Sequence, residues 1–135
     1  MNLRWLPERL AIVRFSKDAA LPVLPAHGFV SVTRTEEELS LVIDATHIPK
    51  GAQRAEVGWR ALVVEGPLDF SLVGVISGLS QPLAVAGISI FVISTYDTDI
   101  LMVREADRAR AQDVLTRAGH AITTTGEGRD GQRSA

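Results

Sequence analysis

The sequence predicts an α+β fold, with the clearest pattern in the second half of the chain. Short runs rich in β-branched and aromatic residues, such as Ile88 to Ile93, are typical of buried strands. Two stretches carry apolar residues at helical spacing, one after Asp69 and one from Glu105 to Ala118. Together they give the order strand, helix, strand, strand, helix, strand, which is the split βαβ arrangement of ferredoxin-like folds.

The composition indicates a globular chain and argues against several classes of protein. Of the 135 residues, 46% are hydrophobic and 22% are charged, which is ordinary for a chain with a real core. A formal net charge of -2 argues against an electrostatic nucleic-acid binder. There is no cysteine, so disulfides, thiol catalysis and cysteine metal sites are excluded. The three histidines are far apart, and Asp97 to Asp99 lacks the further ligands of a calcium loop, so we expect no metal, and we expect no cofactor. The chain shows neither a secretory signal nor an unbroken apolar span, so we expect a cytoplasmic protein without a membrane partner.

The first half of the chain contains three expected strands and little helix. Leu10 to Phe15 is a run of mostly apolar residues, and Phe29 to Arg34 alternates apolar with polar residues. Leu39 to Asp44 follows after a short acidic turn, so the last two strands are predicted to form a hairpin. Prolines interrupt Ala19 to Pro25, and His47 to Val57 is predicted to be a connector. This half could be a reduced copy of the second unit with weakened helices.

The first strand and helix of the second half have clear boundaries. Trp59 to Glu65 is a predicted strand, and Asp69 is a candidate N-cap because its carboxylate can accept free backbone N–H groups. Gly87 is where the helix is expected to end. Pro82 is expected to kink or restart this helix, at a cost of about 3 kcal/mol if it is unrelieved in mid-helix.

A hairpin, a polar helix and a last strand complete the second half. The strands Ile88 to Ile93 and Ile100 to Val103 are joined by a polar turn, a helix then extends to Ala118, and His120 to Thr124 is a short strand. The predicted parts are a reduced N-terminal unit over residues 1–57, a C-terminal domain over 58–125 and a disordered tail over 126–135. Trp5 and Trp59 are predicted to be core or interface anchors.

Three segments resemble a family of small bacterial proteins made of paired ACT domains. They are the run FVISTYDTD from Phe91 to Asp99, and upstream GPLDF (66–70) and PLAVAGISI (82–90). The family is related to the regulatory domains of aspartate kinases and to arginine-sensing ACT proteins of animals. The resemblance covers Trp59 to Ile122 well and the first half by element order. It implies two ferredoxin-like ACT units in tandem, the first with reduced helices.

The resemblance also implies ligand binding without catalysis. ACT domains typically bind amino acids between two ACT units. In the arginine-sensing relatives the positions equivalent to Thr95, Tyr96 and Asp99 line the ligand. The first loop corresponds to Leu68 to Leu72, where the relatives have an acidic residue and this chain matches it with Leu72. The expected ligand-binding residues are therefore Asp69, Phe70, Ser71, Leu72, Ser94, Thr95, Tyr96 and Asp99.

The chemistry of these residues suits an amino acid, but a simpler interpretation stands beside it. A helix that starts after Asp69 offers N–H groups to a carboxylate, and Asp99 can accept from an ammonium in a bond worth about 1.5–3 kcal/mol. Alternatively, Asp69 is only a cap, and Thr95, Asp97 and Thr98 only stabilise a turn. The resemblance favours a ligand role for Thr95, Tyr96 and Asp99, whereas Asp97 is interpreted as a turn residue.

The sequence therefore predicts an amino-acid-binding regulatory or sensor protein that is not an enzyme. The alternative is a protein-interaction module without a small-molecule ligand, and an enzyme is the third choice because fold alone does not decide function. A homodimer is expected because the sheet edge of an ACT unit is usually paired with another.

Overall fold

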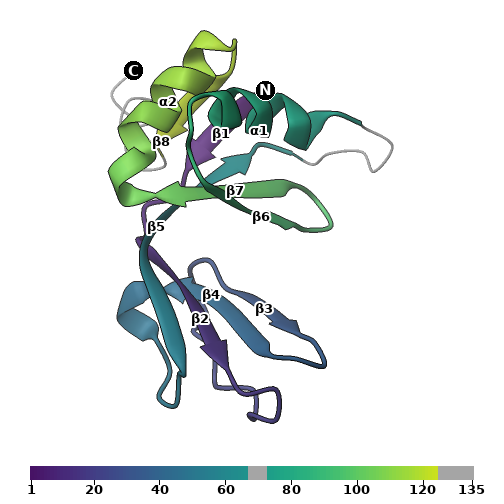
Figure 1. Cartoon of the computed structure of the whole chain (residues 1–135), viewed down its shortest axis with the longest axis vertical. Helices are drawn as coiled ribbons and strands as arrows, with labels where there is room; N and C mark the ends of the chain where they lie inside the picture. The colour runs from purple at the N-terminus through teal and green to yellow at the C-terminus, as the bar shows by residue number, and fades with distance from the viewer. Residues whose placement is uncertain (67–72, 125–135) are drawn as a thin grey trace. The chain divides into compact units, whose positions relative to one another are not determined.

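The computed structural model describes residues 1–66 and 73–124, and the chain divides into two compact units (Figure 1). Met1–Pro7 and Arg60–Ala135 form the first, here called the helical unit. Glu8–Trp59 form the second, here called the strand unit. The sequence-based boundary at residue 57 groups residues 1–7 with the first half, whereas the contacts place this segment with the C-terminal helices.

The strand unit is an antiparallel sheet with the order β3-β4-β2-β5. Its strands are β2 (Leu10–Phe15), β3 (Ser31–Arg34), β4 (Leu39–Asp44) and the first part of β5 (Arg54–Val64). The predicted hairpin of β3 and β4 is confirmed, with Arg34 opposite Leu39 at its closed end. No α-helix occurs in this unit, whose helical content is the 3-10 turn η1 (Ala45–His47). Its buried core consists of Ala11, Val13, Phe15, Leu39, Leu41 and Ile43.

The prediction of a connector over His47 to Val57 is wrong for its last four residues. Strand β5 already begins at Arg54, and the side chains from Arg54 to Val57 are exposed. Arg54 to Val57 alternates charged with apolar residues, a strand pattern too short to identify a strand by itself, and none of the four side chains is buried. Gly58 interrupts the regular geometry of β5 with a φ of 83°, a conformation that side chains rarely tolerate.

The helical unit contains the predicted order of strands and helices. It runs through β5, α1 (Val75–Val85), β6 (Ile90–Ser94), β7 (Asp99–Arg104), α2 (Arg108–Arg117) and β8 (Ala121–Thr124). A 3-10 turn, η2 (Glu105–Asp107), precedes α2. Both helices cover one face of the sheet (Figure 1). The mixed α+β, ferredoxin-like class is therefore confirmed.

A strand that was not predicted lies inside this sheet. β1 (Asn2–Trp5) pairs antiparallel with β5 and parallel with β8, which gives the order β6-β7-β5-β1-β8. Backbone bonds fix both ends of β1: Glu65 N–H donates to Asn2 O, and Leu6 N–H donates to Ala61 O, each at 2.9 Å.

Helix α1 begins later than predicted and continues through its proline. Its N-cap is Gly74, and the predicted N-cap, Asp69, lies outside the described residues. Pro82 lacks the N–H that would bond to the carbonyl of Gly78, and His120 Nε2 lies 3.3 Å from that oxygen. The helix ends as predicted, with Gly87 at a φ of 74°. The predicted tail over 126–135 also lies outside the described residues.

The core of the helical unit is centred on Trp5. This side chain is fully buried, its Nε1 donates to Gln112 Oε1 at 2.9 Å, and the Arg108 guanidinium lies 5.2 Å from its ring centre. Leu79 and Leu83 of α1 pack in the same core, together with Leu3, Leu62, Val64, Leu101, Val103, Ala111 and Leu115. No helix among the described residues is long and apolar enough to cross a membrane.

We expect acid to destabilise the strand unit through Asp44. The backbone N–H of Thr46 donates to Asp44 Oδ1 at 2.9 Å and the Thr46 hydroxyl donates at 2.7 Å, and these bonds lower the pKa of Asp44 below its ordinary 3.8. Because the folded pKa is the lower one, the stabilisation is present above pH 3.8 and is lost as the pH falls through the folded value.

Urea unfolding of the parent and of Asp44→Asn across this range measures the effect. The amide oxygen can accept the same bonds without titrating, so the variant should lose less stability in acid than the parent does. An identical pH dependence in both proteins would contradict the assignment.

Candidate functional site

The β6–β7 turn is held together by its own hydroxyl groups. Thr95 N–H donates to Thr98 O at 2.8 Å, and Thr95 Oγ1 donates to that same oxygen and accepts from Thr98 N–H, both at 3.2 Å. At the base of the turn, Ser94 Oγ donates to Asp99 Oδ1 at 2.7 Å. The polar side chains of this segment therefore stabilise the turn, as the simpler interpretation predicts.

Thr98 also ties the turn to the centre of the sheet. Its hydroxyl donates to the backbone carbonyl of Val64, at the end of β5. The turn is thus attached to the strand that leads directly into Glu65 and Gly66.

A groove of about 530 Å³ lies at this junction within the helical unit. Leu3 and Trp5 of β1 point into the core below the helices, so Arg4 between them faces the other side of the sheet. Val63 is the partner of Arg4 in the β1–β5 register. The groove is lined by Arg4, Val63, Val64, Glu65, Gly66, Asp97 and Thr98.

The groove combines one cationic side chain with two carboxylates. The Arg4 guanidinium can bind a carboxylate through two parallel hydrogen bonds. Asp97 and Glu65 are exposed carboxylates that can accept hydrogen bonds from an ammonium group. This arrangement suits a ligand that carries both charges. Among the described residues, no group of three His, Asp or Glu side chains is placed to hold a metal ion.

The structure describes four of the eight predicted ligand residues. Asp69, Phe70, Ser71 and Leu72 lie in the segment 67–72, outside the described residues. Ser94 and Asp99 bond to each other, and the Thr95 hydroxyl is used within the turn. Tyr96 is 80% exposed. None of these four described residues lines the groove. The turn residues that do line it are Asp97 and Thr98.

The sequence analysis placed none of the groove's lining residues in the predicted site, and Arg4 is the one whose strand it also failed to predict. It lies in a four-residue strand that ends just before Pro7, and the strand's partners lie far away in the chain. The alternation of Leu3 and Trp5 with Arg4 was the one available signal, and it is too short to identify a strand by itself.

Comparisons with known proteins identify the domain and its relatives. The family model for the ACT domain matches residues 54–117. The crystal structure of protein Atu0741 from Agobacterium tumefaciens is 38% identical, with a TM-score of 0.84 over 91% of this chain and 92% of that one.

Two aspartate kinase structures share the fold at much lower identity. The aspartokinase alpha and beta subunits are 17% identical, with a TM-score of 0.58 over 87% of this chain and 97% of that one. The aspartate kinase of Clostridium acetobutylicum is 11% identical, with a TM-score of 0.62 over 86% of this chain and 34% of the enzyme.

Replacing Thr98 with valine should destabilise the helical unit by about 1 kcal/mol, because the bond to the Val64 carbonyl is lost while the side-chain shape is kept. Urea unfolding measures this change, and Thr116→Val on the exposed side of α2 is the matched control. Equal stabilities of the two variants would show that the tie between turn and strand contributes nothing.

Proposed function

The chain belongs to the family of Agobacterium tumefaciens Atu0741 and carries an ACT domain, and on this premise we propose that it is a regulatory protein that binds an amino acid. The proposed site is the groove between Arg4 and Asp97. The ACT domain and the fold shared with aspartate kinases support a regulatory small-molecule-binding role. The choice of an amino acid rests on the charges of the groove and on the resemblance of the β6–β7 turn.

The presence of both charges among the residues that line the groove is the observation that carries this proposal. The Arg4 guanidinium is the proposed partner of the ligand carboxylate. Asp97 is the proposed partner of the ammonium group because it lines the groove, and Asp99 remains a second candidate from the resemblance. Val63, which is partly exposed, supplies apolar surface to the groove. No step of chemistry on the ligand is part of the proposal.

The proposal keeps the segment matched to the first loop and the two tandem ACT units that the resemblance implies, the first with reduced helices. The segment Leu68 to Leu72, which the resemblance matches to the first loop of the relatives, begins two residues after Gly66, which lines the groove. We propose that Asp69, Phe70, Ser71 and Leu72 contact the ligand from this segment. We also propose that the protein self-associates, so that a second copy can contribute an ACT unit.

A thermal-shift screen of the common amino acids at millimolar concentration tests the proposed function. A ligand present at about 100 times its dissociation constant should stabilise the protein by about 2.7 kcal/mol, which raises the melting temperature by several degrees. Arg4→Met should remove this shift, whereas Arg117→Gln on the exposed side of α2 should keep it. If no amino acid stabilises the parent, the alternative of an interaction module without a ligand is favoured.

The amide variants Asp97→Asn and Asp99→Asn separate the two candidate carboxylates. Each keeps the size of the side chain, and the amide oxygen that Asp99→Asn introduces can still accept from Ser94, so the turn should remain folded. Replacing the carboxylate that binds the ammonium group should weaken binding by about tenfold or more, since a charge-assisted bond is lost. Calorimetric titration measures both dissociation constants, and unchanged binding in both variants would exclude the turn from the site.

A further inference from the structure

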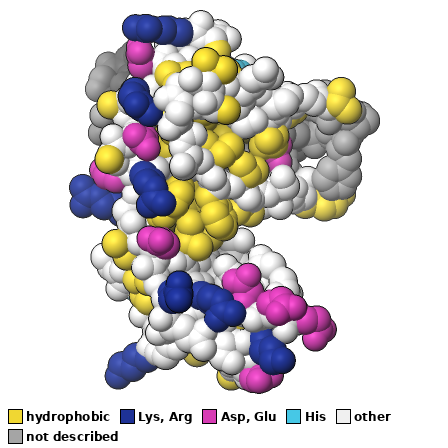
Figure 2. Space-filling model, viewed as in Figure 1, with side chains coloured by type: hydrophobic (Ala, Val, Ile, Leu, Met, Phe, Trp, Pro, Cys, Tyr) yellow, Lys and Arg dark blue, Asp and Glu magenta, His cyan; other side chains and the backbone are white. Residues whose placement is uncertain are grey.

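A row of hydrogen-bond donors crosses the strand unit on the face opposite its core. In the register of the sheet, Arg14 of β2 lies opposite Arg54 of β5 on one side and opposite Ser40 of β4 on the other. Ser40 in turn lies opposite Thr33 of β3. The residues on either side of Arg14 and Ser40 belong to the core of this unit, so the row lies on the other face. Figure 2 shows Lys and Arg side chains gathered over the strand unit.

The two arginines of this row place like charges on neighbouring strands. Side chains opposite each other in an antiparallel pair lie close together, and like charges at such positions destabilise a sheet. Neither Arg14 nor Arg54 forms an ion pair with a carboxylate in the part of the chain that the structure describes. An anion bound between the two guanidinium groups would offset this repulsion.

The Arg14 guanidinium is held in position by its neighbours. Its Nη1 donates to Oε1 of Gln53, and its Nη2 donates to the carbonyl oxygen of Glu37 at 3.0 Å. A guanidinium has more N–H groups than these bonds use, so Arg14 can still donate to a ligand. Arg54 is exposed and can turn toward the same ligand.

The other half of the row consists of hydroxyl groups. Ser40 is half-buried and Thr33 is exposed, and neither hydroxyl has a hydrogen-bond partner among the described residues. Neighbouring strands are about 4.8 Å apart, so the Ser40 hydroxyl lies one strand away from Arg14. It can donate to an oxygen of an anion that the arginines hold.

Carboxylates border the row and limit the kind of anion that it can attract. Glu56 lies two residues beyond Arg54 on the same face of β5, opposite Ile12. Glu38 lies two residues before Ser40. These charges would repel the ends of a long polyanion, so the row suits a small anion with its charge concentrated between the arginines.

We propose that this row binds the phosphate group of a small molecule between Arg14 and Arg54. A phosphate group has up to two negative charges near neutral pH and several acceptor oxygens, and guanidinium groups bind such oxygens in pairs. A carboxylate has a single charge and would leave the second arginine without a counter-charge. The site shares no residue with the groove that contains Arg4, so it goes beyond the proposed amino-acid site.

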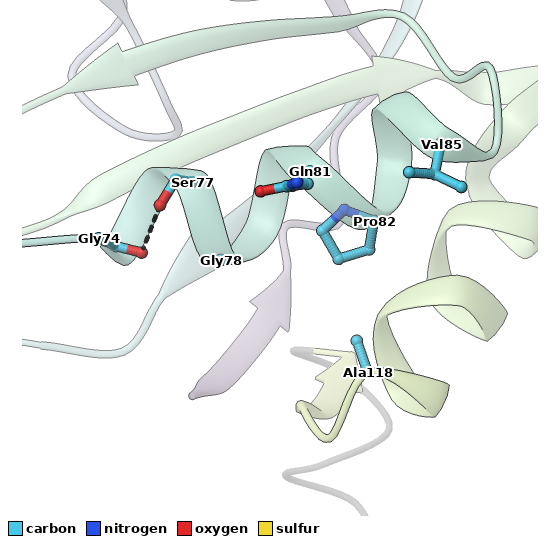
Figure 3. A pocket seen from close by; sticks show the side chains of 7 residues that line it. All are labelled: Gly74, Ser77, Gly78, Gln81, Pro82, Val85 and Ala118. Carbon is cyan, nitrogen blue, oxygen red and sulfur yellow. Dashed lines mark hydrogen bonds between the residues drawn. The ribbon is translucent and has the colours of Figure 1, made fainter.

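The groove along helix α1 lacks this chemistry. It has a volume of about 580 Å³ and extends from Gly74 to Val85 (Figure 3). None of the side chains that line it is charged, and the Ser77 hydroxyl already donates to the carbonyl oxygen of Gly74 at 3.2 Å. A phosphate group that binds to arginine side chains is therefore expected at the row or, as the competing location, at Arg4.

Urea unfolding of the full chain, with and without millimolar inorganic phosphate or a simple phosphate monoester, tests the site at constant ionic strength. Phosphate should raise the unfolding midpoint of the parent, because it binds the folded chain. Arg54→Gln should weaken phosphate binding by about tenfold or more, since a charge-assisted contact is lost. In chloride alone the same variant should be more stable than the parent, because the repulsion between the arginines is relieved.

Three further variants locate the effect. Lys50→Gln removes the same charge from an exposed turn of the strand unit and should keep the response to phosphate. Arg4→Met should also keep it, although it is expected to lose the response to an amino acid. Glu56→Gln should tighten phosphate binding by about two- to fivefold, because a repelling carboxylate is removed.

The results that support the inference differ clearly from those that overturn it. A response to both probes, or to the monoester alone, that Arg54→Gln removes supports the site whether or not any amino acid binds. A parent that responds to neither probe would overturn it. So would a response that Arg54→Gln keeps, or one that Arg4→Met removes.

Discussion

The sheet of the helical unit depends on its N-terminal strand. β1 is the partner through which β8 joins the sheet in the described chain, because β8 pairs with β1 and β1 pairs with β5. Trp5 reinforces this position, since it is fully buried and contacts α2 through Gln112 and Arg108. A strand of four residues therefore connects the final strand of the chain, helix α2 and the centre of the sheet.

The same strand links the fold to the proposed function. The alternation that buries Leu3 and Trp5 below the helices places Arg4 on the opposite face, beside the turn that contains Asp97. The ACT domain itself supplies the turn and the end of β5, and the N-terminal segment supplies the cation.

Local signals predicted much of the fold, and long-range pairing explains most of what was missed. The hairpin of β6 and β7 and the end of α1 at Gly87 depend on nearby residues, so the sequence identified them. β1 depends on partners that lie far along the chain, and no short pattern announces it. The first residues of β5 were not predicted to form a strand because their side chains are exposed. Asp97 was not predicted to line the site because its place in a turn already explained it.

The central claim is that an amino acid binds between Arg4 and the β6–β7 turn, and amide NMR spectra during a titration test it most directly. With the amino acid that gives the largest thermal stabilisation, the account predicts that the largest shifts occur at Arg4, at Glu65 and Gly66, and at Asp97 and Thr98. Shifts confined to Glu8–Trp59, or none at saturating concentration, would contradict it.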